Sequence, residues 1–238
     1  MIKAITFDLW NTLLVEKSFT ERRLTILAEA LDIEGQQVYE EDLERAYATA
    51  QKRHNELWVK EYCHYPLSER LDDILREVKA TLRPTLRKAV VDKFGDIILD
   101  DPPSLTDGAA DTVARLSTRY KLGIISDTGV TSGSKIKELL DKNGIMKYFT
   151  STIFSDETGI CKPRKEAFDQ ALKALGAKAD EAIHVGDLLR TDVAGAKAAG
   201  MNAVWIKIRE PDAEGITPDY TITRLNELLK IPVIAERL

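Results

Sequence analysis

Several acidic and hydroxyl side chains of this sequence stand directly after short apolar runs. Asp8 follows the first run, Ser126 and Asp127 end a second, and Asp187 follows a third. Short apolar runs between polar turns are typical of strands that are buried on both faces. In an open parallel sheet, ligands bind beyond the carboxyl ends of the strands. The pattern therefore predicts that these polar side chains meet at one edge of a sheet.

Two further residues join this set. Lys162 lies in a loop just before a predicted helix, and Asp192 follows Asp187 by five residues. Crowded carboxylates repel one another, so they need a proton or a cation between them. Magnesium prefers oxygen ligands and substrate phosphates, and the Ser126 hydroxyl with nearby backbone N–H groups can bind phosphoryl oxygens. The residues together indicate chemistry on a phosphate group.

Strands and helices that alternate along the chain must position these side chains. Strands are predicted at residues 2–7, 121–126, 181–186 and 203–206, and helical patterns at 111–120, 134–143, 163–175 and 191–199. Alternation of this kind favours a parallel sheet with helices on both faces. The fold class is therefore α/β, with a Rossmann-like parallel sheet as its core.

Residues 16–99 interrupt this alternation. Four amphipathic helical patterns follow one another there without a strand, which is typical of a small helical bundle. The segment Asp100–Ser104 contains two prolines and reads as a linker. We therefore expect a catalytic core at 1–15 and 100–238, with an inserted helical cap at 16–99.

Composition limits the possible partners. The formal net charge is −5 and no basic block stands out, which argues against nucleic acid. No apolar stretch is long enough for a membrane span. Cys63 and Cys161 stand far apart, outside any metal-ligand spacing, as expected for reduced thiols of a cytoplasmic protein. The oligomeric state stays open.

The order of the motifs resembles that of the haloacid dehalogenase-like (HAD) hydrolases. Asp8–Leu13 is similar to their first motif, Ile125–Asp127 to the second, Lys162-Pro163 to the third, and Gly186-Asp187 with Asp192 to the fourth. Each motif alone is weakly specific, but all four occur in family order at predicted element ends. The helical insert falls between the first and second motifs, where many members carry a cap.

The resemblance implies a phosphatase with three catalytic residues. Asp8 is then the nucleophile that forms an aspartyl-phosphate. Ser126 donates a hydrogen bond to the phosphoryl group, Lys162 neutralises charge, and Asp127 contacts the substrate, chiefly through its backbone N–H. The implied substrate is a small phosphate monoester.

The resemblance also implies a Mg²⁺ site. Asp8, Asp187 and the backbone carbonyl of Trp10 are the expected ligands, and Asp192 completes or orients the metal shell. In this family the cap closes over the site and selects the substrate. Trp58, the single tryptophan of the cap, is therefore a candidate substrate contact, although a place in the bundle core would explain it equally.

Trp10 departs from the pattern of the family's phosphatases. They carry a second Asp two residues after the nucleophile, as a general acid and base, and tryptophan cannot fill that role. An aromatic residue there also resembles the 2-haloacid dehalogenases, which carry Tyr at this position but need no metal and lack the Gly-Asp motif. Two alternatives to a phosphatase stay open: a 2-haloacid dehalogenase and a weakly active protein that binds phosphate or metal.

Overall fold

The chain divides into two compact units. The computed structural model describes residues 1–236 and 238. The core unit comprises Met1–Glu16, Pro103–Asp127 and Leu140–Leu238, and the cap unit comprises Lys17–Pro102 and Thr128–Leu139. In the described part of the chain, no helix is both long and apolar enough to cross a bilayer.

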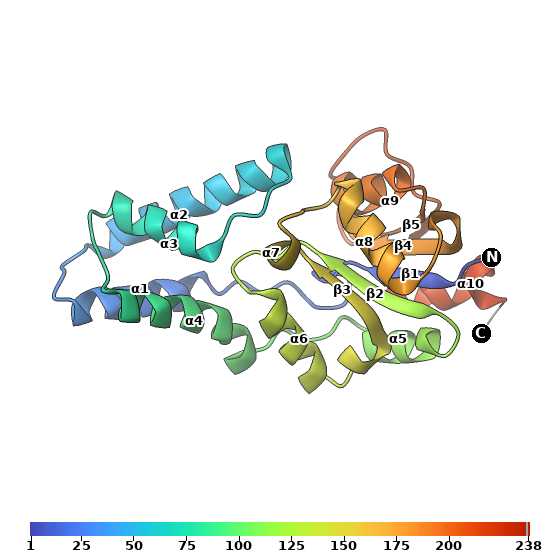
Figure 1. Ribbon diagram of the computed structural model, residues 1–238, viewed down its shortest axis with the longest axis horizontal. Helices are drawn as coiled ribbons and strands as arrows, with labels where there is room; N and C mark the ends of the chain where they lie inside the picture. Colours follow the sequence, from blue (N-terminus) through green and yellow to red (C-terminus); the bar gives the residue numbers. More distant parts are fainter. Residues whose placement is uncertain (237) are drawn as a thin grey trace. The chain divides into compact units, whose positions relative to one another are not determined.

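A six-stranded parallel sheet forms the centre of the core unit (Figure 1), in the order β3-β2-β1-β4-β5-β6. Its strands are β1 Ala4–Phe7, β2 Lys121–Ser126, β3 Phe149–Phe154, β4 Ala182–Gly186, β5 Asn202–Ile206 and β6 Tyr220–Ile222. The predicted α/β class is confirmed. The sequence patterns indicated the four inner strands but neither β3 nor β6.

The position of β1 explains why the polar ends of the strands meet. Strand order reverses direction between β1 and β4, and such a switch point opens a crevice at the carboxyl ends of the strands. Phe7 pairs with Ile124 of β2 on one side and with Val185 of β4 on the other. The residues that follow these strands therefore leave the sheet next to one another.

Helices cover both faces of this sheet, with α8 and α9 on one face and α5 on the other (Figure 1). The helices after the cap insertion are α5 Ala109–Ser117, α6 Gly133–Lys142, α7 Ser155–Thr158, α8 Lys165–Leu175, α9 Ala194–Ala198 and α10 Pro232–Ala235. Phe168 and Leu175 of α8 pack with Ile125 and Trp205 in one buried apolar cluster. The packing of α8 fixes the loop that precedes it.

One predicted helix start is wrong. The sequence pattern places Pro163 in the first turn of a helix, but α8 begins at Lys165. Pro163 lies instead in a turn that is closed by a hydrogen bond of 3.1 Å from the Arg164 N–H to the Cys161 carbonyl. The Lys162–Pro163 peptide bond is cis.

The inserted segment Lys17–Pro102 of the cap unit contains four helices, one for each pattern predicted in this region, and most of α6 belongs to the same unit. The four helices are α1 Thr20–Ile33, α2 Glu40–Glu56, α3 Leu67–Glu77 and α4 Pro84–Asp100, and a π-helical turn, Leu57–Glu61, extends α2. Apolar faces of all four helices share one buried cluster that includes Leu27, Leu43, Leu71 and Phe94. The cap unit thus has a hydrophobic core of its own.

Candidate active site

The loop after β1 holds Asp8 at the edge of the sheet. The Asp8 N–H donates to the Val185 carbonyl at 2.8 Å, which continues the pairing with β4. The N–H groups of Leu13 and Leu14 both donate to the Leu9 carbonyl, at 2.8 and 2.9 Å. This tight loop requires a positive φ of 57° at Asn11, a conformation that asparagine tolerates better than most residues.

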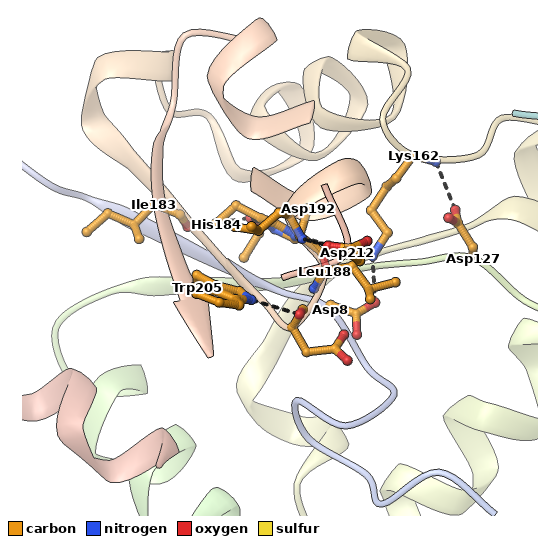
Figure 2. A network of polar contacts seen from close by, with 12 residues as sticks. Asp8, Asp127, Lys162, Ile183, His184, Leu188, Asp192, Trp205 and Asp212 are labelled. Carbon is orange, nitrogen blue, oxygen red and sulfur yellow. Dashed lines mark hydrogen bonds and ion pairs between the residues drawn. The ribbon is translucent and has the colours of Figure 1, made fainter. Parts of the chain in front are cut away.

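A buried lysine connects Asp8 to a second carboxylate (Figure 2). The Lys162 ammonium lies 2.5 Å from Asp8 Oδ1 and 2.7 Å from Asp192 Oδ1. The side chain of Lys162 is only 3% exposed, and those of Asp8 and Asp192 are 8% and 1% exposed. Residues far apart in the chain therefore form one buried ionic network.

Asp192 is fixed from three directions. Its Oδ1 atom accepts from Lys162 and lies 3.3 Å from Nε2 of His184, and its Oδ2 atom accepts from the Leu188 N–H at 3.0 Å. A Cβ atom at Gly186 would lie 2.2 Å from Asp192 Cγ. Only glycine fits there, because the carboxylate packs directly against the end of β4.

The contacts of His184 define its tautomer. An ionised Asp192 only accepts hydrogen bonds, so Nε2 of His184 carries the proton and donates to it. The Nδ1 atom is then an acceptor for the Thr6 hydroxyl, 2.9 Å away. Burial lowers the pKa of His184, which keeps the imidazole neutral.

Electrostatics separate the roles of the carboxylates. Burial raises the pKa of Asp8 well above its ordinary value, and Lys162 only partly opposes this. Burial also disfavours the charge of Asp192, but Lys162 and His184 outweigh it and lower that pKa. For Lys162, the charges of Asp192 and Asp8 exceed the effect of burial and raise its pKa. The lysine is therefore held as a cation.

Asp187 stands at the end of β4 and points toward the same region. Burial, followed by the charge of Asp192, raises the pKa of Asp187 to about 7. Arg209 opposes this shift through an ion pair of 2.9 Å. The Asp187 carbonyl accepts from the indole N–H of Trp205 at 2.9 Å, which anchors the loop (Figure 2). A proton or a cation would relieve the repulsion at this carboxylate.

Three carboxylates in this arrangement suit a hard cation. Asp8, Asp187 and Asp192 each offer an oxygen atom, and these atoms lie within 4.8 Å of one another. Such oxygen donors fit Mg²⁺. Because both oxygen atoms of Asp192 already accept hydrogen bonds, Asp8 and Asp187 are the freer donors of the three.

The end of β2 supplies a hydroxyl group and a loop anchor. Ser126 is 1% exposed, and within the described residues its Oγ atom has no hydrogen-bond partner. A buried hydroxyl without a partner indicates a ligand atom at that point. Asp127 accepts from the backbone N–H of Lys162 at 2.9 Å, so its side chain holds the lysine loop.

Two predicted residues, Trp10 and Trp58, lie in different units of the fold. Trp10 is half-buried in the loop after Asp8, where it forms a backbone bridge with Leu14. Trp58 belongs to the cap unit and is half-buried in its π-helical turn. Sequence reasoning also gave no function to His184, which lies inside an apolar run and shows its contact with Asp192 only after folding.

Comparison with known proteins identifies the family. Residues 2–200 match the family model of haloacid dehalogenase-like hydrolases, so the chain belongs to this family. It is similar to the glyceraldehyde 3-phosphate phosphatase of Methanopyrus kandleri, with 31% identity over 97% of both chains. It is also 34% identical to the enzyme of the same name from Pyrococcus furiosus, over 97% of this chain and 92% of the relative. The predicted family and hydrolase class are confirmed.

Solved structures agree with the fold. The 2-haloacid dehalogenase of Pseudomonas syringae pv. Tomato superposes with a TM-score of 0.73, at 24% identity over 99% of both chains. The HAD-hydrolase YfnB of Bacillus subtilis, crystallised with magnesium, has a TM-score of 0.66 at 21% identity, over 96% of this chain and 97% of that one. At these identities the similarity establishes the fold.

Proposed function

We propose that the protein is a magnesium-dependent phosphatase that hydrolyses a small phosphate monoester through Asp8. The observation that carries this proposal is the buried Asp8–Lys162–Asp192 network beside Asp187, at the switch point of the sheet. Two relatives that cover 97% of this chain bear the name of a phosphatase.

The residues divide the reaction into two displacements. A carboxylate oxygen of Asp8 attacks phosphorus, and the bond from phosphorus to the ester oxygen breaks. The ester oxygen departs as an alkoxide and takes a proton from solvent water. Water then attacks the phosphorus of the aspartyl-phosphate, which releases inorganic phosphate and restores the Asp8 carboxylate. The Ser126 hydroxyl donates to a phosphoryl oxygen in both steps, and the charge of Lys162 favours the ionised form of Asp8, which partly offsets the burial that raises its pKa.

Asp8 and Asp187 would hold the metal, together with the backbone carbonyl of Trp10. When bound, Mg²⁺ supplies positive charge that offsets the phosphoryl oxygens and aligns them for attack. Asp192 acts mainly on its neighbours, because its two oxygen atoms position Lys162 and close the loop at Leu188.

Trp10 limits the choice of leaving group. Its indole cannot donate a proton to the departing oxygen as a carboxylic acid would, and general acid catalysis typically contributes about 10²–10⁴-fold. The enzyme should therefore favour esters of acidic alcohols, or an acid supplied by the substrate. Its relatives are named for a phosphorylated three-carbon aldehyde, so small phosphorylated carbonyl compounds are the first class to examine.

The direct test is phosphate release by wild type and Asp8→Asn, with magnesium or EDTA, from p-nitrophenyl phosphate, glyceraldehyde 3-phosphate and 3-phosphoglycerate. We expect magnesium-dependent release that Asp8→Asn abolishes. Lys165→Met serves as a matched control, since the Lys165 ammonium pairs with Asp169 on the surface at 2.7 Å. Release that persists in Asp8→Asn would refute the proposed nucleophile.

Chloride release from 2-chloropropionate is measured with the same samples. The aromatic side chain at Trp10 is the feature that favours a dehalogenase. The three clustered carboxylates oppose it, because a metal site has no evident use in that reaction. Chloride release without phosphate release would replace the proposal.

A further inference from the structure

The cap unit contains two buried arginines that lie close together. Arg23 of α1 is 9% exposed and Arg70 of α3 is 3% exposed. Burial, and then the charge of Arg23, lowers the pKa of Arg70 to about 10, and burial also lowers the pKa of Arg23. Both guanidinium groups are therefore still cations at neutral pH, in a place where burial disfavours charge.

The neighbours of this pair are neutral or cationic. Arg23 donates to the Tyr47 hydroxyl, and Arg70 donates to the amide oxygen of Gln51 at 3.4 Å. The Arg70 guanidinium also lies over the ring of Tyr65, 5.4 Å from its centroid. The charge of Arg70 acts on His54, whose pKa falls to about 3, with burial as the main cause. These contacts solvate the guanidinium groups in part, and the carboxylate beside them, Asp73 at the Tyr65 hydroxyl, is already paired with Arg53 and Arg76.

Three N–H groups of the pair lack an acceptor among the described residues. They are Arg23 Nε, Arg70 Nε and Arg70 Nη2, and Nδ1 of the adjacent His54 also lacks a partner. Buried N–H groups are almost always hydrogen-bonded, so three such groups without an acceptor in one place require an explanation. A water molecule would satisfy the N–H groups but leave two positive charges side by side, whereas an anion would satisfy both needs.

Two other arginines of the cap, by contrast, form ion pairs with carboxylates. Arg87 of α4 donates through Nε and Nη2 to the two carboxylate oxygens of Asp72, both at 2.8 Å. Arg53 forms an ion pair of 2.5 Å with Asp73. These arginines are more exposed than Arg23 and Arg70, yet each has a carboxylate. The buried pair is the one in greater need of a counter-charge.

From this contrast we propose that the cap unit binds an oxyanion, a carboxylate or phosphate group, between Arg23 and Arg70. The guanidinium fork matches the geometry of both groups. Gln51 and His54 beside the pair are half-buried, so the cluster reaches the surface on that side. The anion is either a free ligand or a second acidic group of the substrate, and the latter reading rests on the proposed phosphatase function.

A binding experiment tests the site without any turnover. Arginine Nε–H resonances are followed by ¹H–¹⁵N NMR in EDTA while sulfate or acetate is added, and Arg23→Lys and Arg70→Lys variants assign the signals. We expect the Arg23 and Arg70 resonances to move downfield and saturate. The Arg87 resonance, whose Nε–H is already bonded, should stay in place. If the Arg23 and Arg70 resonances move only at anion concentrations that also move the Arg87 resonance, the proposal is overturned.

Kinetics then identify the source of the anion. 3-Phosphoglycerate and glyceraldehyde 3-phosphate differ by a carboxylate in place of an aldehyde, so the ratio of their kcat/KM values reports recognition of the carboxylate. Arg70→Gln should lower this ratio about tenfold or more, the effect of one charge-assisted hydrogen bond, and Arg87→Gln should leave it unchanged. An unchanged ratio in Arg70→Gln, with saturable NMR shifts, would assign the site to a free anion. If the wild-type protein shows no phosphatase activity, the proposed function is refuted, but the NMR test of anion binding stays valid.

Discussion

Replacement of Lys162 by methionine should destabilise the metal-free protein strongly. The ammonium lies 2.5 Å from Asp8 and 2.7 Å from Asp192, and each attraction amounts to about 6 kcal/mol at an effective dielectric constant of about 20. Part of that energy offsets the burial of three charges. Removal of one partner from a buried ion pair costs about 3–5 kcal/mol. For a chain of this size, the melting temperature should fall by about 6–20 °C.

The assay is thermal unfolding in EDTA of wild type, Lys162→Met, Asp8→Asn and the double variant. The double variant should lose less than the sum of the single variants, because Asp8→Asn removes a charge that Lys162→Met leaves unpaired. Lys165→Met, at an exposed pair, should stay within about 1 kcal/mol of wild type. A loss below about 1 kcal/mol in Lys162→Met, or strict additivity with Asp8→Asn, would refute the proposed network.

Four further predictions concern the same site. Gly186→Ala should weaken magnesium binding about 10–100-fold by calorimetry, because the new Cβ displaces Asp192; an unchanged Kd would contradict this. In EDTA, a rise in pH from 5 to about 7 should lower the stability of wild type more than that of Asp187→Asn. The pKa of Asp187 is about 7 in the folded protein against an ordinary 3.8, so over this range the folded protein binds a proton that the unfolded chain has released. If the stability of both proteins changes equally with pH, the raised pKa of Asp187 is excluded. His184→Phe should lower kcat/KM about 10–100-fold while His184→Gln, which keeps a donor toward Asp192, loses less; equal losses would assign His184 a packing role alone. Trp10→Asp should raise kcat on an alkyl phosphate more than on p-nitrophenyl phosphate, by up to about 10²-fold, and no gain on the alkyl ester would contradict the argument on the leaving group.

The sequence predicted the centre of the sheet better than its edges. β1, β2, β4 and β5 are buried on both faces, so they appear as continuous apolar runs. At the edges, β3 mixes buried residues with half-buried and exposed ones, and β6 has three residues of which one is buried. Edge strands carry polar side chains, and their pattern does not stand out from that of a loop.

The same limit applies to the polar residues of the site. Asp8, Ser126 and Asp187 were predictable because each stands at the end of an inner strand. His184 was not, since its role depends on how the turn after β4 brings Asp192 back over the strand. Arg23 and Arg70 lie on amphipathic helices, where charged residues usually face water, and only the packed bundle shows that they are buried.

The separation of Asp8 and Lys162 along the chain has a consequence for synthesis. Their contact spans 154 residues, and ribosomes add about 5–20 residues per second. Asp8 therefore leaves the ribosome roughly 8–30 s before Lys162. During that interval the cap helices, whose contacts are local, can form. The ion pair between Asp8 and Lys162 thus cannot exist in a nascent chain that ends before Lys162, so the first and third motifs come together only late in synthesis.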